Sequence, residues 1–246
     1  MPCFRIVVAY DGTDYVGWQR QANGVAIQEL IEEALRAIDG RAVAVAGAGR
    51  TDSGVHALGQ VAAFTIERAL SPDAVVRALN AHLPDAIRIM SADEVPPSFH
   101  PRFDAIAKTY RYRIWNGEVV SPFERRYTWH LTGALDVDAM SGAARLVEGE
   151  HDFAAFQATG SEVATTERNV TSSLVSKDEP LIVYEITGAG FLRHMVRTVV
   201  GTLVEIGRGR QPVEWMAAVL ASRDRAAAGP TAPAAGLFLV RVDYPG

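Results

Sequence analysis

The chain has 246 residues, of which 48% are hydrophobic and 22% charged, as is typical of a folded soluble protein with a substantial core. Its one cysteine, Cys3, excludes a disulfide within the chain and a cysteine-rich zinc site, and its six histidines are too scattered to predict a metal centre. No apolar run reaches the roughly 20 residues of a membrane-spanning helix, and no secretory signal is recognisable, so we expect a cytoplasmic protein that needs no metal.

The formal net charge of −5 does not by itself favour a nucleic-acid partner. The distribution of charge is more informative, because acidic residues dominate 29–39 and 136–152, whereas basic residues gather at 102–113, 125–126 and 193–210. An acidic surface with one basic face can still bind a polyanion. The layout therefore mildly favours an RNA partner.

The first part of the chain predicts a strand–helix–strand–strand–helix–strand order. Apolar residues spaced along one helix face predict a helix from Ile27 that Gly40 ends. Ser71 and Pro72 are a typical helix start, with a capping hydroxyl and a proline in the first turn. This order is that of a split βαβ, or ferredoxin-like, fold. The expected strands cover 4–10, 42–46, 60–66 and 87–92, and the second helix covers 71–83.

The second part, from near residue 107, alternates strands and helices in a related order. Tyr110, Tyr112 and Ile114 alternate with arginines, which predicts a strand with one aromatic and one basic side. Residues 178–180 predict the turn of a hairpin. The element order indicates a two-lobed α+β fold. The other expected elements are helices over 136–148, 192–206 and 212–222 and strands over 170–177, 181–187 and 237–242.

The segment from Gly47 to Ala57 concentrates residues that could carry chemistry. It lies between two expected strands, where a scaffold can present a loop. Flanking glycines could bring Asp52 close to a ligand, and Arg50 is a cation that would keep this carboxylate ionised. The same residues also suit a turn without catalysis, and local physics alone favours that simpler interpretation.

Two other chemistries fit this loop poorly. Asp52-Ser53-Gly54 matches the core of an aspartic protease, but the chain has no second such motif to supply the partner carboxylate. A phosphate-binding loop would require a lysine that the segment lacks.

The loop resembles the signature of TruA-type tRNA pseudouridine synthases. Arg50-Thr51-Asp52-Ser53-Gly54-Val55-His56-Ala57, followed by Gly59-Gln60-Val61, carries this resemblance. Further segments resemble the family in the same order along nearly the whole chain. They are Tyr10-Asp11-Gly12-Thr13 with Tyr15, Gly17, Trp18 and Gln19; Phe99-His100-Pro101-Arg102-Phe103; Lys108-Thr109-Tyr110-Arg111-Tyr112; His151-Asp152-Phe153 with Phe156; Phe191-Leu192-Arg193-His194-Met195-Val196-Arg197; and Ala234-Ala235-Gly236-Leu237 with Leu239.

The resemblance implies the pseudouridine synthase fold, with two ferredoxin- or RRM-like lobes that share a mixed, largely antiparallel central sheet with flanking helices. Residues 1–105 would form the lobe that carries the catalytic loop, and 106–246 the lobe that completes the active-site cleft. The implied activity is isomerisation of uridine to pseudouridine at positions 38, 39 and 40 of the tRNA anticodon stem-loop, by a homodimer without cofactor or metal.

The resemblance also implies roles for individual residues. Asp52 is the essential carboxylate, and attack on the sugar, attack on the base and removal of a sugar proton all stay open as its role. Arg197 is expected to hold that carboxylate, although it could equally be a solvated helix residue. Tyr110 is expected to stack on the extruded base, although a strand tyrosine could simply be core.

Substrate-binding roles follow in the same way. Leu237 is expected against the uracil, although it could be an ordinary strand core residue. Side chains that flank the expected pocket in sequence are candidates for contacts with the RNA backbone. They are Arg20, Arg50, Arg102, Lys108, Arg111, Arg193 and His194.

A rival interpretation is a non-catalytic RNA-binding protein built from two RRM-like lobes. It predicts an RNP-type aromatic pattern, which the sequence lacks. It also leaves Arg50 and Asp52 unexplained, because a carboxylate repels phosphate.

Overall fold

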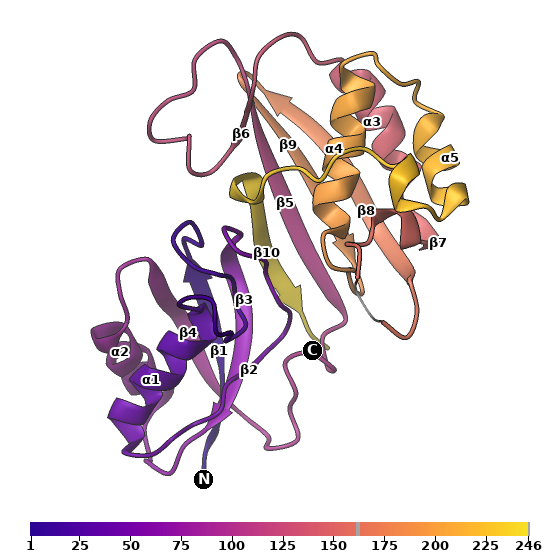
Figure 1. Ribbon diagram of the computed structural model, residues 1–246. Coiled ribbons are helices and arrows are strands. Elements are labelled where there is room, and N and C mark those ends of the chain that lie inside the picture. The colour runs from indigo at the N-terminus through magenta and orange to yellow at the C-terminus, as the bar shows by residue number, and fades with distance from the viewer. Residues whose placement is uncertain (161–162, 246) are drawn as a thin grey trace. The chain divides into compact units, whose positions relative to one another are not determined.

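The computed structural model describes residues 1–160 and 163–245, which form two compact units (Figure 1). Unit 1 comprises Met1–Ile106 together with the last strand of the chain from Phe238, and unit 2 comprises Ala107–Leu237. Among the described residues, no helix is long and apolar enough to cross a lipid bilayer.

Unit 1 confirms the expected order of strands and helices. The central strand of its sheet is β1, which pairs antiparallel with β3 on one side and with β4 on the other. β2 pairs antiparallel with β3. The two helices lie side by side on one face of the sheet (Figure 1). The elements are β1 (Cys3–Tyr10), α1 (Ile27–Asp39), β2 (Ala46–Gly47), β3 (His56–Thr65), α2 (Pro72–His82) and β4 (Ile87–Val95).

The last strand of the chain, β10 (Leu237–Asp243), runs parallel to β3 through Phe238 and Leu239. Sequence order places this strand in the second lobe, whereas its pairing brings it into unit 1 beside the start of β3.

Local signals explain both helices of unit 1. In α1, Ile27, Ile31 and Leu35 are buried along one face, and Gly40 ends the helix in the left-handed region at φ 79°, where its N–H donates to Arg36 O. In α2, the Ser71 hydroxyl accepts a hydrogen bond from the Ala74 N–H, the capping role expected of it.

The strand expected over 42–46 is wrong, because only Ala46–Gly47 enters the sheet. Val45 directs its backbone to helix side chains instead: its N–H donates to Glu32 Oε1 at 3.2 Å, and its carbonyl accepts from Gln28 Nε2 at 2.8 Å. The backbone groups are therefore satisfied without a strand partner. The strand expected from residue 60 begins earlier, at His56, where Ala57 pairs with Tyr10.

Unit 2 is built on an antiparallel sheet in the order β5–β9–β8–β7, with β6 parallel to β5. The expected hairpin is confirmed as β8 and β9, and α3 and α4 pack against each other. The elements are β5 (Ala107–Asn116), β6 (Trp129–Leu131), α3 (Val137–Arg145), β7 (Gly149–Asp152), β8 (Glu167–Asp178), β9 (Leu181–Gly188), α4 (Met195–Gly207) and α5 (Trp215–Ser222). The α+β class with largely antiparallel strands is confirmed.

Three details of unit 2 differ from expectation. The short strands β6 and β7 have three and four residues, too few to show a strand period in the sequence. Helix α4 starts at Met195 rather than at 192, because His194 adopts φ 65° and cannot continue a helix. The other helices are also shorter than expected, α3 ending at Arg145 and α5 starting at Trp215.

Candidate active site

Asp52 lies at the tip of the loop that joins β2 to β3, in unit 1. The loop makes a tight turn in which the Val55 N–H donates to the Asp52 carbonyl at 3.1 Å and Gly54 adopts φ 77°. Thr51 and Val55 are buried, Asp52 is half-buried, and Ser53 is exposed. The chain thus forms the turn that local residues favour, and this turn holds the Asp52 side chain at the edge of the buried region.

The segment that follows β1 supports this loop from one side. The Trp18 N–H donates to the Thr51 carbonyl at 3.1 Å, and the Tyr15 carbonyl accepts from the Gly54 N–H at 3.3 Å and from the Ser53 hydroxyl at 3.2 Å. These bonds hold residues on both sides of Asp52. The support explains why residues 10–19 accompany the loop in the resemblance.

Two glycines of the supporting segment are required by close approach. A Cβ at Gly12 would lie 2.0 Å from the Val55 carbonyl oxygen. A Cβ at Gly17 would lie 2.4 Å from the Thr51 carbonyl oxygen, and Gly17 also has φ 107°. Because no L side chain fits there, the backbone of this segment can lie directly against the loop.

A buried polar layer lies beneath the loop. The hydroxyls of Tyr10 and Thr51 are 2.8 Å apart and hydrogen-bonded, and both residues are buried. Gln60 is fully buried, and its Nε2 donates to the Gly49 carbonyl at 2.9 Å. Burial raises the pKa of Tyr10, so its hydroxyl stays protonated. These contacts were not predicted from the sequence; the polar Gln60 within an apolar strand was the available signal.

His56 has a structural place. It is 1% exposed, its Nδ1 accepts a hydrogen bond from the Gly12 N–H at 3.0 Å, and its ring stacks on Phe238 with centroids 4.7 Å apart. The imidazole therefore connects the loop, the supporting segment and β10 within unit 1.

Tyr110 lies on β5 in unit 2, opposite Ile186 of β9. It is 8% exposed, and Phe191 meets its ring edge-on with centroids 5.0 Å apart. This environment places an aromatic face beside a second aromatic side chain.

Arg197 lies in the first turns of α4 and is tied to the segment that leads to Leu237. Its Nε donates to the Ala232 carbonyl at 2.7 Å, while the Ala232 N–H donates to the Arg197 carbonyl at 3.0 Å. The Tyr112 hydroxyl donates to the Pro233 carbonyl at 2.8 Å in the same segment. Unit 2 therefore holds Arg197 and buried Leu237 through one short stretch of chain.

Two further candidates, Arg193 and His194, directly precede α4. Arg193 is exposed, and its carbonyl accepts from the Ala158 N–H at 2.9 Å. His194 is half-buried.

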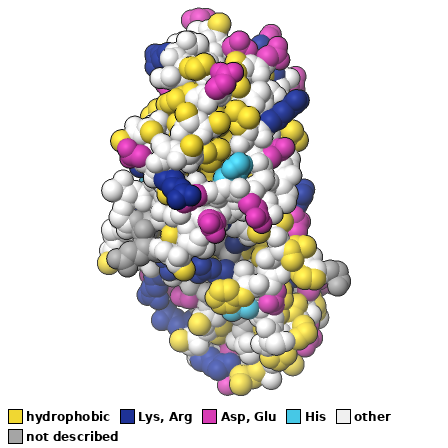
Figure 2. Space-filling view, turned by 90° about the vertical axis from the view of Figure 1, so that its right-hand side faces the viewer, with side chains coloured by type: hydrophobic (Ala, Val, Ile, Leu, Met, Phe, Trp, Pro, Cys, Tyr) yellow, Lys and Arg dark blue, Asp and Glu magenta, His cyan; other side chains and the backbone are white. Residues whose placement is uncertain are grey.

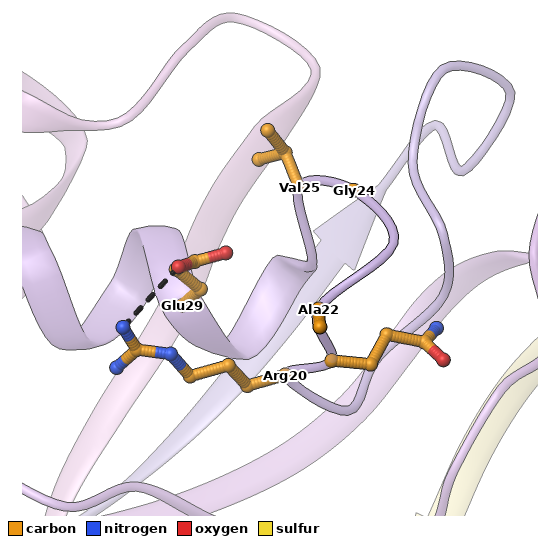
Figure 3. A pocket seen from close by; sticks show the side chains of 6 residues that line it. Arg20, Ala22, Gly24, Val25 and Glu29 are labelled. Atoms are coloured by element: carbon orange, nitrogen blue, oxygen red, sulfur yellow. Dashed lines mark ion pairs between the residues drawn. The ribbon is translucent and has the colours of Figure 1, made fainter.

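Arg20 and Arg111 lie beside carboxylates. Arg20 is 3.4 Å from Glu29 and 3.7 Å from Glu32, and Figure 3 shows its guanidinium reaching along a shallow pocket toward Glu29. Arg111 Nη2 is 2.9 Å from Glu185 Oε2 on the neighbouring strand. Both pairs are partly exposed, so their side chains can exchange a carboxylate for a phosphate at small cost.

The remaining basic candidates are distributed over both units. Arg50 is exposed two residues before Asp52, Lys108 is half-buried on β5, and the Arg102 guanidinium lies 5.6 Å from the Phe103 ring centroid. Figure 2 shows that Lys and Arg side chains gather in patches on the face drawn, most closely at its lower left.

Within residues 1–160 and 163–245, no group of three or more His, Cys, Asp or Glu side chains could hold a metal ion.

Comparison with known proteins gives one consistent result. The family model described as tRNA pseudouridine synthase matches residues 6–104 and 143–245. Three relatives are each described as tRNA pseudouridine synthase A. The protein of Pelobacter propionicus is 47% identical, over 99% of this chain and 100% of its own length. The protein of Moorella thermoacetica is 48% identical, over 99% of this chain and 100% of its own length. The protein of Solibacter usitatus is 49% identical, over 98% of this chain and 98% of its own length.

Proposed function

The chain belongs to the tRNA pseudouridine synthase family, and from this premise we propose that it converts uridine to pseudouridine at positions 38, 39 and 40 of the tRNA anticodon stem-loop. Membership makes it an isomerase that modifies tRNA. One observation carries the proposal: the similarity runs over nearly the full length and includes the whole Asp52 loop and the segment that supports it.

The proposed reaction is balanced within the nucleoside. The bond between N1 of uracil and C1′ of the sugar breaks, the base turns, and a bond forms between C5 and C1′. The C5 proton leaves and N1 gains a proton, so no oxidant, reductant or cofactor is consumed. An ionised carboxylate suits either a nucleophile or a base in such a reaction, and Asp52 is the proposed group.

We assign the other catalytic roles as the family resemblance implies. Tyr110 offers a ring for the extruded base, which loses its stacked neighbours when it leaves the RNA. Arg197 is the arginine assigned to the carboxylate, and its bond to Ala232 supports this role because it fixes the guanidinium before substrate binds. Leu237 is assigned to apolar contact with the uracil.

The proposed partner is tRNA, bound through its phosphates by the basic candidates named above. Three adjacent positions of a stem cannot all be selected by one rigid set of base contacts. The shape and deformability of the RNA should therefore determine which uridines react. We also propose that the protein acts as a homodimer in the cytoplasm.

Tritium release from tRNA labelled at uracil C5 tests this function directly. Wild-type protein, assayed without added metal, should release tritium, and Asp52→Asn should lose release while it still binds tRNA. Asp73→Asn is the matched control, because Asp73 is an exposed carboxylate of α2 in the same unit and should leave the rate unchanged.

Substrates with a single labelled uridine at position 38, 39 or 40 locate the reaction. Release from all three supports the proposed positions. Binding of tRNA without release by the wild type would favour the non-catalytic RNA-binding interpretation. Release from uniformly labelled tRNA, but from none of these three substrates, would overturn the positions alone.

A further inference from the structure

We propose that Tyr10 is a positioning residue for Asp52, acting through the hydroxyl of Thr51. This inference deepens the proposed function and rests on the catalytic role proposed for Asp52. Tyr10 ends β1 and is 4% exposed, so it reaches the loop from within the core of unit 1.

Thr51 is held at two atoms. Its Oγ1 lies 2.8 Å from the Tyr10 hydroxyl oxygen, and its carbonyl accepts from the Trp18 N–H at 3.1 Å. That carbonyl belongs to the peptide group that joins Thr51 to Asp52. The two contacts together fix the orientation of this peptide plane, which sets the direction in which the Asp52 side chain leaves the backbone.

Gln60 extends this support to the other end of the loop. Its Oε1 accepts from the Val61 N–H at 3.1 Å and its Nε2 donates to the Gly49 carbonyl at 2.9 Å, so the amide orientation is determined by both partners. Two buried side chains therefore support the loop before Asp52, Gln60 at Gly49 and Tyr10 at Thr51.

The polar nature of this layer indicates more than packing. A buried hydroxyl or amide is unfavourable unless it is hydrogen-bonded, and an apolar side chain of similar size could fill the same space. Here the bonds of Tyr10 and Gln60 all end on the loop or on β3 beside it. Catalysis gains from such support, because a misplacement of about 1 Å can lower a rate roughly 100-fold.

Hydroxyl deletions test the proposal. Tyr10→Phe and Thr51→Val should each lower the single-turnover rate of tritium release by about 10- to 100-fold, while the Kd for tRNA changes by less than about twofold. Thr51→Ser keeps the hydroxyl and should retain most of the wild-type rate. The double variant should be no slower than the slower single variant, because both changes remove the same bond.

Tyr184→Phe is the matched control. Tyr184 is 1% exposed on β9, and its hydroxyl is 2.9 Å from the Ser173 hydroxyl within the β8–β9 hairpin. Tyr10→Phe and Tyr184→Phe should both lower the Tm by about 2–4 °C, since each removes one buried hydrogen bond. Only Tyr10→Phe should slow tritium release.

The outcomes separate the two proposals. A wild-type rate in Tyr10→Phe, with Asp52→Asn inactive, overturns the positioning role and leaves the proposed function standing. Equal slowing by Tyr10→Phe and Tyr184→Phe, or additive effects of Tyr10→Phe and Thr51→Val, also overturns it. A wild-type protein that releases no tritium overturns both.

Discussion

Tyr10 in unit 1 and Tyr184 in unit 2 are both buried strand tyrosines whose hydroxyls meet a second hydroxyl, that of Thr51 at 2.8 Å and that of Ser173 at 2.9 Å. Burial raises the pKa of both phenols, so both stay protonated and can donate. The partners differ. Ser173 belongs to the β8–β9 ladder, where backbone bonds already hold it, whereas Thr51 lies in a loop outside any ladder.

A buried hydroxyl pair therefore has consequences beyond stability in the loop but not in the hairpin. In the hairpin, the hydroxyl pair adds to a backbone that pairing already holds in place. In the loop, the side-chain bond helps to decide the conformation itself, and the next residue is the proposed catalytic carboxylate. We therefore expect equal chemistry in the two units to have unequal effects on activity.

The largest effect should follow from Gly12→Ala. The new Cβ would lie 2.0 Å from the Val55 carbonyl oxygen, so the supporting segment and the loop must separate. We expect single-turnover tritium release to fall by roughly 100-fold or more, together with a lower Tm. Gly142→Ala in α3 is the contrasting change in unit 2.

At Gly142 the nearest atom to a new Cβ is Val213 Cγ1 at 3.5 Å, an ordinary contact. Alanine is also favoured over glycine inside a helix by about 1 kcal/mol. Gly142→Ala should therefore leave the rate unchanged and the Tm equal or higher. A normal rate in Gly12→Ala would show that close approach of this segment does not position the loop.

An intermediate effect concerns acid stability, for which one carboxylate of each unit, Asp39 and Asp152, can be compared. Backbone hydrogen bonds, first from Arg68, lower the pKa of Asp39 in unit 1 below its ordinary 3.8. A hydrogen bond from the Thr166 hydroxyl lowers the pKa of Asp152 in unit 2, and a hydrogen bond from the Ala154 N–H and the positive charge of Arg223 lower it further. Both carboxylates are therefore harder to protonate in the folded chain.

A lowered pKa in the folded state stabilises the fold above the unfolded value of about 3.8, and this contribution is lost as the pH falls through the folded value. Asp39→Asn and Asp152→Asn should thus be less stable than wild type at neutral pH, with differences that shrink below about pH 4. Thermal unfolding between pH 7 and pH 2 measures this. A difference that stays constant to pH 2 would contradict the assignment.

The smallest expected effects come from substitutions in two cross-strand ion pairs of similar geometry, one in each unit. Arg5 and Asp93 are paired in unit 1 at 2.9 Å, and Arg111 and Glu185 in unit 2 at 2.9 Å. Both pairs are partly exposed, so Arg5→Gln and Arg111→Gln should each change stability by less than about 1 kcal/mol. Only Arg111→Gln should weaken tRNA binding.

Salt dependence gives the sharper readout of this last comparison. Loss of one phosphate contact lowers the slope of log K against log salt concentration by about 0.7–0.9. Arg111→Gln should show this change and Arg5→Gln should not. Equal slopes in both variants would remove Arg111 from the RNA-binding residues.

Several elements could be predicted because their signals are local. The Ser71 cap, the Gly40 stop and the apolar face of α1 all act within a few residues, and the structure confirms the helices that they indicate. The turn around Asp52 also follows from its own residues. The strand expected over 42–46 failed because the side chains of Gln28 and Glu32 compete for the backbone of Val45.

The α+β class, most helices and strands and the position of the Asp52 loop between strands all follow from the amino-acid sequence, and its resemblance indicates the family. The contacts that support that loop could be seen only in the folded chain, because Tyr10 and Thr51 are 41 positions apart and β10 joins β3 from the far end of the chain. Periodicity and capping report on neighbours along the chain. A hydrogen bond between distant side chains depends on strand register, which brings residues together without leaving a local pattern.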